Sequence, residues 1–382
     1  MSSLPPILPN PRPSDAIENE GMTPAARRAE EEKNAMRRYF ERPGEQLLPL
    51  AQQEPVCLYL ETTNRCNLLC VTCPRTYEQL EPEADMSYEL FTSLIAQFPN
   101  IARVVLHGVG EPMLVKDLAQ RVGYLKQRGI YTLFNTNGTL LTEANGRPLI
   151  DAGLDELRVS LDAADPAVYQ MVRGKDFFNR IVANVRNFTR MQRERNSPRP
   201  RVSLWLTGLR ETVDQLPSFV RLAHEIGVAE VYLQRLVFFD EGANQASLAR
   251  AESALFEHTT AREDALIHEA ERLAVELGVT FSASGAVDPG ESIRMQRTDN
   301  PNPWTLCRRP WSLMYVTANG RVLPCCIAPF SMRGYGSFTL GDATQSGLRE
   351  IWNGPEYQRF RAGLLTSSPP PSCANCGLRW SL

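Results

Sequence analysis

The sequence lacks the features that would assign the chain to nucleic acid or to a membrane. Its 41 lysines and arginines are balanced by 44 aspartates and glutamates, so no excess of positive charge would attract a polyanion. No apolar run approaches the roughly 20 residues that span a bilayer. The first residues, MSSLPPILPNPRPSD, have no basic start followed by an apolar stretch and therefore do not form a secretory signal. We expect a cytoplasmic protein, with 43% hydrophobic residues to fill a sizeable core.

The nine cysteines fall into two groups, with one left over. An odd number of cysteines in a reducing cytosol argues against disulfide bonds. Cys66, Cys70 and Cys73 lie within eight residues of each other, and five more cysteines occupy the last 76 residues. Cys57 stands alone in an apolar run, where we expect it to be a small buried side chain. Two separate groups predict two metal sites.

Short apolar runs alternate with helical patterns from residue 55 onward. The predicted strands are 56–62, 102–107, 130–136, 156–162, 202–207, 230–234 and 279–284, and the predicted helices include 87–98, 117–129 and 263–277. This alternation is typical of parallel βα units, whose reactive groups lie at the carboxyl ends of the strands. We therefore predict an α/β fold: a partial (β/α)6 barrel, TIM-like but open, followed by a small α+β cysteine-rich domain.

Three segments follow from this pattern. Residues 1–54 form an extension that is partly disordered and carries one charged helix at 24–41. Residues 55–285 form the barrel, with an insertion at 236–262. Residues 286–382 form the cysteine-rich domain, which begins with a linker rich in proline and glycine.

The first cysteine group, in ETTNRCNLLCVTCPR, follows the first predicted strand. Three thiolates in a short loop can bind three irons of a cubane cluster and leave the fourth iron open. Structural zinc is the alternative, with His107 as a fourth ligand. The segment resembles the defining loop of the radical S-adenosylmethionine (SAM) superfamily. That resemblance implies a 4Fe–4S cluster on Cys66, Cys70 and Cys73, and reductive cleavage of SAM to a 5′-deoxyadenosyl radical.

The same resemblance implies residues that bind SAM at the ends of the following strands. LHGVGEP resembles the family's motif for the SAM amino group and supplies Gly108, Gly110 and Glu111. The alternative for it is a plain turn. The remaining candidates at later strand ends are Asn135 and Asn137 in FNTNG, Ser160 and Asp162 in VSLDA for the ribose, and Arg235 for the SAM carboxylate. Arg173, in VRG, is another candidate for the carboxylate, and a surface salt bridge is the alternative for Arg235.

The second cysteine group resembles the opening of a SPASM domain. Cys307 is followed by Gly320 and then Cys325, and a CxxC pair, Cys373 and Cys376, lies close to the end. Asn319-Gly320 predicts the turn of a β-hairpin that brings Cys307 and Cys325 together. Because the chain ends six residues after Cys376, we expect one auxiliary 4Fe–4S cluster, as in the shortened twitch version.

Two alternatives remain for this group. Structural zinc on four cysteines has the same spacing. Cys326 could also replace Cys325 as the ligand, or pack nearby as a free thiol.

These observations favour an enzyme that abstracts hydrogen from a small polar metabolite, of the sugar, aminoglycoside or amino-acid type, with net oxidation. The alternatives are a peptide maturase, a radical epimerase and, in another class, a non-catalytic metal-binding protein. The short extension before residue 55 shows no strands, which disfavours a leader-binding domain there, and no cobalamin domain is identified in it. The expected partners are the substrate and an electron donor such as flavodoxin or ferredoxin.

Overall fold

The computed structural model describes residues 46–78, 80–237, 247, 249–255, 259–284, 289–293, 302–331 and 335–374. The predicted helix at 24–41, much of the insertion at 236–262, part of the linker and Cys376 lie outside these residues. Everything below concerns the described part of the chain.

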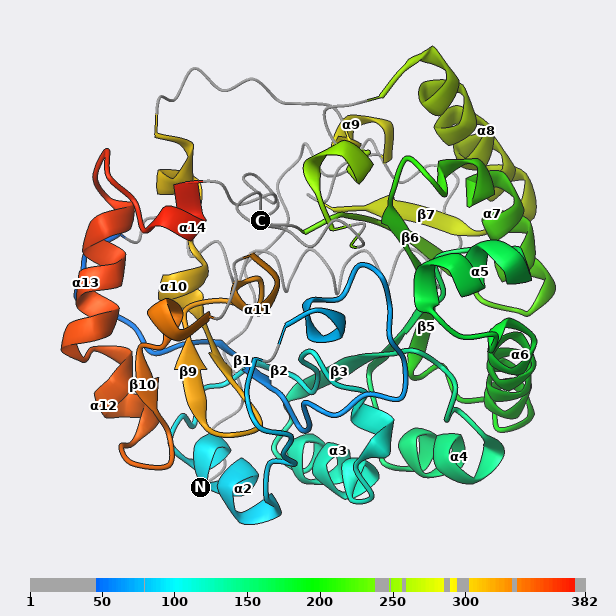
Figure 1. Ribbon diagram of the computed structural model, residues 1–382. Coiled ribbons are helices and arrows are strands. Elements are labelled where there is room, and N and C mark those ends of the chain that lie inside the picture. The colour runs from blue at the N-terminus through cyan, green and yellow to red at the C-terminus, as the bar shows by residue number, and fades with distance from the viewer. Residues whose placement is uncertain are drawn as a thin grey trace, which may run out of the picture. The chain divides into compact units, whose positions relative to one another are not determined.

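Seven parallel strands form the barrel, and each coincides with a predicted segment (Figure 1). They are β1 (Cys57–Leu60), β2 (Arg103–Val105), β3 (Tyr131–Thr136), β4 (Glu156–Ser160), β5 (Arg201–Gly208), β6 (Glu230–Arg235) and β7 (Thr280–Ala283), and they pair in chain order. Because neighbouring strands are parallel, the loops that follow them all leave from one edge of the sheet.

Three further strands from the cysteine-rich segment extend the same sheet beyond β1. They are β8 (Leu313–Val316), which is parallel to β1, β9 (Arg321–Leu323), which is antiparallel to β8, and β10 (Gly341–Asp342). The predicted hairpin is confirmed, and Gly320 in its turn has a φ of 91°, which favours glycine. The sheet is therefore continuous between the two cysteine groups, and the domain boundary at 285/286 stays a prediction.

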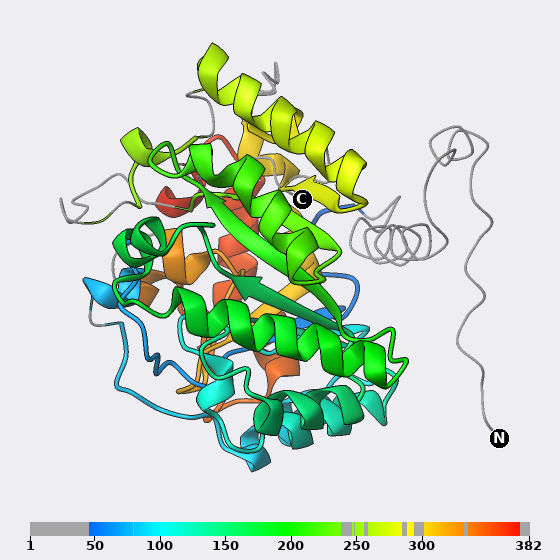
Figure 2. The same ribbon diagram turned by 90° about the vertical axis from the view of Figure 1, so that its right-hand side faces the viewer.

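The helices between the strands lie along the outer side of the arc of strands (Figures 1 and 2). They are α2 (Tyr88–Ala96), α3 (Leu118–Lys126), α4 (Glu143–Asp151), α5 (Pro166–Arg173), α6 (Phe178–Glu194), α7 (Leu216–Glu225) and α8 (Ala261–Leu277). Local sequence sets their starts: Ser87 accepts a hydrogen bond from the Leu90 amide, and Thr260 and Glu263 form a capping box at α8.

Further helices and 3-10 turns complete the described chain. The helices α9 (Pro289–Ile293), α10 (Arg309–Ser312), α11 (Ala328–Ser331), α12 (Leu348–Trp352), α13 (Pro355–Leu364) and α14 (Pro371–Ala374) are accompanied by 3-10 turns at Pro74–Thr76, Pro112–Leu114, Val213–Gln215, Ala251–Ser253, Pro303–Leu306 and Tyr335–Phe338. Buried Arg361 of α13 donates to the Pro310 carbonyl at 2.9 Å, which joins α13 to α10.

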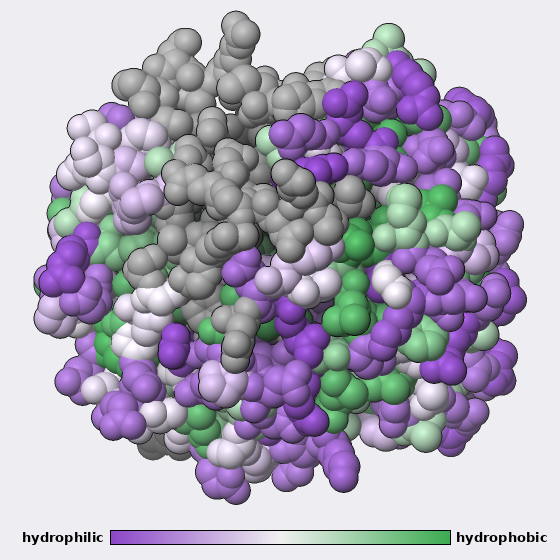
Figure 3. Space-filling model, viewed as in Figure 1, coloured by the Kyte–Doolittle hydropathy of each residue, from purple (hydrophilic) through white to green (hydrophobic). Residues whose placement is uncertain are grey.

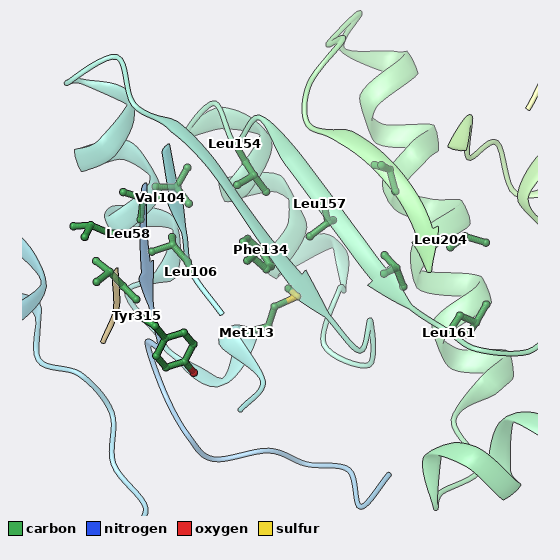
Figure 4. Close-up of a cluster of buried hydrophobic side chains, with 14 of the residues drawn as sticks. Leu58, Val104, Leu106, Met113, Phe134, Leu154, Leu157, Leu161, Leu204 and Tyr315 are labelled. Atoms are coloured by element: carbon green, nitrogen blue, oxygen red, sulfur yellow. The ribbon is translucent and has the colours of Figure 1, made fainter. Parts of the chain in front are cut away.

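The two faces of the sheet differ in chemistry. Alternate strand residues such as Leu58, Val104, Phe134, Leu157 and Leu204 pack against the helices and form the main core (Figure 4). We call the opposite face the inner face.

Aromatic and charged side chains occupy the inner face. Trp205 and Tyr232 stack with ring centroids 4.0 Å apart, and the Arg158 guanidinium lies 4.6 Å from the Trp205 ring. Figure 3 views the side seen in Figure 1 and shows hydrophilic residues over the outer helices, with apolar patches among them. No helix among the described residues is long and apolar enough to span a membrane.

Candidate active site

The loop after β1 carries the first cysteine group at the carboxyl edge of the sheet. Cys70 is buried, while Cys66 and Cys73 are partly buried. The loop folds on itself, because the Cys73 amide donates to the Cys70 carbonyl at 3.1 Å and the Thr76 hydroxyl donates to the same oxygen at 2.8 Å. Burial raises the pKa of the Cys73 thiol to about 12, and the neighbouring Cys70 and Cys66 add to the rise. A bound cation would favour the thiolates.

A second segment, at the end of α5, holds this loop in place. The Val71 amide donates to the Val172 carbonyl at 2.9 Å. A side chain at Gly174, whose φ is 75°, would meet the Leu69 carbonyl oxygen at 2.5 Å, so only glycine fits there. Arg173 lies between these contacts and reaches the Cys70 sulfur, with 3.7 Å between Nη1 and Sγ.

Arg173 also forms a buried ion pair with Asp162. Nη2 of Arg173 is 2.6 Å from Oδ2 of Asp162, and Oδ1 accepts a hydrogen bond from the Thr207 amide at 2.7 Å. Protein groups therefore engage both carboxylate oxygens of Asp162, and its role toward a ribose remains a prediction. Arg173, predicted to bind the SAM carboxylate, is beside the cluster loop.

An amide network joins the cysteine loop to the end of β3. Nδ2 of Asn137 donates to Oδ1 of Asn67 at 2.7 Å and lies 4.0 Å from the Cys66 sulfur. Nδ2 of Asn67 donates in turn to the Thr139 hydroxyl at 2.7 Å. The predicted residue Asn137 is thus brought to the first cysteine group, while Asn67 and Thr139 were not predicted.

The two glycines of the GVGEP segment pack against the β1 end and the cysteine loop. A side chain at Gly110 would meet the Thr63 carbonyl oxygen at 2.1 Å, and the neighbouring Glu111 amide donates to the Arg65 carbonyl at 2.8 Å. A side chain at Gly108 would meet the Glu61 carboxylate at 2.1 Å. Close approach to protein therefore already requires glycine at both positions.

Glu111 is buried and accepts three hydrogen bonds. Oε1 accepts from the Met113 amide at 3.1 Å and the Thr136 hydroxyl at 2.7 Å, and Oε2 accepts from the Asn137 amide at 2.7 Å. Burial raises the pKa of Glu111, and these donors oppose the rise. The carboxylate therefore fixes β2 to β3, and its contact with SAM stays a prediction.

The remaining predicted residues are placed differently. Arg235 is buried, and its Nε donates to the Ser292 carbonyl of α9 at 2.5 Å. Ser160 lies at the end of β4.

His107, the candidate fourth zinc ligand, makes contacts with the neighbouring strands β1 and β3. Its Nδ1 accepts from the Asn135 amide at 3.2 Å, and its ring packs edge-on to Tyr59. Burial, Arg158 and Arg103 lower the pKa of His107 to about 3, so the imidazole is neutral.

The donor set fits the predicted cofactors. Oδ1 of Asn135, Oη of Tyr169 and Nε of Arg173 are among the buried polar atoms of the described residues that have no hydrogen-bond partner. Such atoms are costly in a closed protein, because a buried polar group needs a partner. A polar cofactor beside the cysteine loop would supply one.

The second cysteine group is only partly described, because Cys376 lies outside the described residues. Cys307, Cys325 and Cys373 are all partly buried. The Trp304 indole donates to the Thr366 carbonyl at 2.9 Å, so the segment before Cys307 contacts the segment that leads to Cys373.

Cys325 and Cys326 have different surroundings. Burial raises the pKa of Tyr357 on α13, and the Cys325 sulfur adds to the rise. Cys326 instead contributes to the raised pKa of Cys57 and Tyr59 on β1, which burial chiefly causes. Cys325 therefore lies toward α13, and Cys326 lies toward the inner face.

An open parallel barrel, whose first loop carries three cysteines among unpaired polar atoms, defines an enzyme class that binds SAM at an iron–sulfur cluster. The family model of the radical SAM superfamily matches residues 60–223. The SPASM model, an iron–sulfur cluster-binding domain, matches residues 307–377. The chain therefore contains a radical SAM domain and a C-terminal SPASM domain. The predicted fold class and cofactors, SAM and 4Fe–4S clusters in both parts, are confirmed.

Similar proteins span both parts of the chain. A PqqA peptide cyclase of Gluconobacter oxydans is 29% identical over 328 residues, which cover 84% of this chain and 82% of the cyclase. A tungsten-containing aldehyde ferredoxin oxidoreductase cofactor-modifying protein of Pyrococcus furiosus is 24% identical, with 84% and 87% covered. The crystal structure of Streptococcus suis SuiB bound to precursor peptide SuiA has the same fold, with a TM-score of 0.58, 15% identity, and coverage of 99% and 79%.

Proposed function

We propose that this radical SAM enzyme acts on a peptide and abstracts hydrogen from one of its residues. The similarity to PqqA peptide cyclases carries the proposal, because it extends over 84% of the chain, through barrel and SPASM domain alike. The expectation of a small polar metabolite has less support, since the similar proteins named above are not metabolite dehydrogenases.

Different residues at the carboxyl edge of the sheet would bind the cluster and the two polar groups of SAM. Cys66, Cys70 and Cys73 would hold the first cluster, which when loaded supplies the electron that cleaves SAM to a 5′-deoxyadenosyl radical. Glu111 would orient the SAM amino group. Arg173, fixed by Asp162 at 2.6 Å, would hold the SAM carboxylate close to Cys70.

The inner face would receive the peptide residue that reacts. It offers the stacked rings of Trp205 and Tyr232 and the guanidinium of Arg158, which is held by Glu156 at 2.6 Å. Flat aromatic surfaces and a fixed cation suit an amino-acid side chain carried on a peptide.

Electrons would come from a partner protein such as flavodoxin or ferredoxin. Leu69, next to Cys70, is 52% exposed, and Met171, two residues before Arg173, is 47% exposed. An exposed apolar surface beside the cluster loop is suited to brief docking of a reductant.

The test is anaerobic incubation of the reconstituted enzyme with SAM, a reductant and short peptides encoded beside its gene. Liquid chromatography with mass spectrometry should detect 5′-deoxyadenosine and a peptide two hydrogens lighter, as coupling or oxidation requires. A peptide of unchanged mass that carries one solvent-derived hydrogen would indicate epimerisation instead. The control is the Cys66→Ala enzyme. Turnover of a sugar or amino acid, with no change in any peptide, would contradict the proposal.

A further inference from the structure

Glu61 is a buried carboxylate that the sequence pattern did not single out. It follows β1 directly, and its residue is 1% exposed. Oε1 accepts from the Val109 amide at 2.8 Å and the Tyr315 hydroxyl at 3.0 Å, and Oε2 accepts from the Ala318 amide at 3.0 Å. One side chain therefore contacts three other parts of the sheet.

The two amides belong to the two halves of the enzyme. Val109 lies between Gly108 and Gly110, in the segment proposed to bind SAM. Ala318 precedes Asn319-Gly320 in the turn between β8 and β9, two strands of the SPASM region. Burial raises the pKa of Glu61 to about 7, and the hydrogen bonds from Ala318, Val109 and Tyr315 oppose the rise.

The Glu61 carboxylate is closely packed between Gly108 and Tyr315. A side chain at Gly108 would meet Oε1 of Glu61 at 2.1 Å and the Tyr315 hydroxyl at 2.3 Å. Tyr315 is held from the other side by Tyr59, whose ring stacks with a centroid distance of 6.3 Å. Movement of the hairpin turn would therefore displace the carboxylate, and with it the Val109 amide.

We propose that Glu61 is a positioning residue that couples the SAM-binding segment 108–111 to the SPASM hairpin turn at Ala318. SAM bound at Glu111 strengthens the hydrogen bond from the Val109 amide to the Glu61 carboxylate. The Glu61 carboxylate, held more firmly, in turn strengthens its hydrogen bond from the Ala318 amide. The coupling is reciprocal, as linkage requires, so a displaced hairpin weakens SAM binding. The inference rests on the SAM-binding role proposed above for this segment.

The first test uses the reconstituted wild-type enzyme. Amide hydrogen exchange, followed by mass spectrometry with and without SAM, should slow at Val109 and also at Ala318. Slower exchange at Val109 with no change at Ala318 would overturn the coupling. No change at either amide while SAM binds elsewhere would instead refute the SAM-binding role of the segment.

The second test uses Glu61→Gln. The glutamine side chain has the same shape as glutamate, but it has one acceptor oxygen for the amides of Val109 and Ala318. Its NH2 group would face one of these two N–H donors. We expect at least tenfold weaker SAM binding by calorimetry, faster exchange at Ala318, and unchanged iron content. Tyr315→Phe removes one hydrogen-bond donor but keeps the hydrogen bonds from the Val109 and Ala318 amides, so its loss of SAM affinity should be smaller.

Glu263→Gln is the matched control. It also replaces a buried carboxylate that accepts from the protein, but in the capping box of α8. It should leave SAM affinity unchanged. Equal SAM affinity in Glu61→Gln and wild type, or an equal loss in both Gln variants, would overturn the inference.

Discussion

Arg173 and Cys70 are 103 residues apart in the chain, yet Nη1 of the arginine lies 3.7 Å from the cysteine sulfur. The guanidinium is held from the other side by Asp162, with 2.6 Å between Nη2 and Oδ2. The end of α5, the end of β4 and the cysteine loop therefore meet at one ion pair. A cation that donates toward a cluster ligand stabilises the reduced cluster, which carries more negative charge.

Replacing Arg173 should therefore make the first cluster harder to reduce. We expect Arg173→Met to lower its reduction potential by about 50 mV, if the lost stabilisation is about 1 kcal/mol for a one-electron couple. A redox titration that is monitored by electron paramagnetic resonance measures the reduction potential of this cluster. Lys175→Met is the control. Lys175 is also a cation beside this loop, but its ammonium group donates to the backbone carbonyl of Asn67 at 2.8 Å and not to a cysteine sulfur. Equal potentials in wild type and Arg173→Met would exclude the effect.

Changing Cys66, Cys70 and Cys73 together to Ala should remove about half of the iron and all SAM cleavage, because each thiolate binds one iron of the first cluster. Iron and zinc analysis after anaerobic reconstitution measures the content. Cys57→Ala is the control and should keep all iron, since this buried thiol lies within β1. Stoichiometric zinc with only four irons in the wild type would contradict the auxiliary cluster.

Cys325→Ala should lose the auxiliary-cluster signal, and Cys326→Ala should keep it. The spacing between Gly320 and Cys325, which resembles the SPASM pattern, favours Cys325 as the ligand, whereas Cys326 adds to the raised pKa of Cys57 and Tyr59 on β1. Electron paramagnetic resonance of the variants, combined with the triple alanine change at the first cluster, reports the auxiliary signal alone. The reverse result would place Cys326 in the ligand set.

The stability of the fold should depend on pH through Glu61. Its pKa is raised to about 7 from an ordinary value of 4.5, so the folded chain binds the proton more tightly than the unfolded chain. Stability is therefore lost as pH rises from about 4.5 to about 7, by on the order of 3 kcal/mol. The groups that face the carboxyl are the Tyr315 hydroxyl and Glu81, which pairs with Arg321 at 2.9 Å.

Thermal unfolding of wild type and Glu61→Gln between pH 5 and pH 8 measures this effect. The stability of the wild type relative to the variant should fall with pH over this interval. A difference that is independent of pH would show that Glu61 keeps an ordinary pKa in the folded chain.

Much of the fold follows from the sequence because strand and helix periods are local properties. All seven predicted barrel strands and the Asn319-Gly320 hairpin are present. The addition of β8 to β1 could not be predicted, because the pairing joins segments about 250 residues apart and leaves no periodic signal.

The site residues that could be predicted from the sequence are those that lie in a recognisable sequence motif. Asn137 lies 4.0 Å from the Cys66 sulfur, because the loops that follow β1 and β3 leave from the same edge of the parallel sheet. Glu61 was missed because a glutamate at a strand end is ordinarily exposed, and its donors Val109, Tyr315 and Ala318 come from segments distant in the sequence.

Transfer of deuterium from the peptide to 5′-deoxyadenosine shows whether this site abstracts hydrogen from the peptide. The enzyme, loaded with both clusters, is given SAM, a reductant and a peptide substrate labelled with deuterium at the carbon that reacts. We expect one deuterium in 5′-deoxyadenosine for each peptide modified, and none with Cys66→Ala. Unlabelled 5′-deoxyadenosine alongside modified peptide, or modification without SAM cleavage, would contradict hydrogen abstraction by this site.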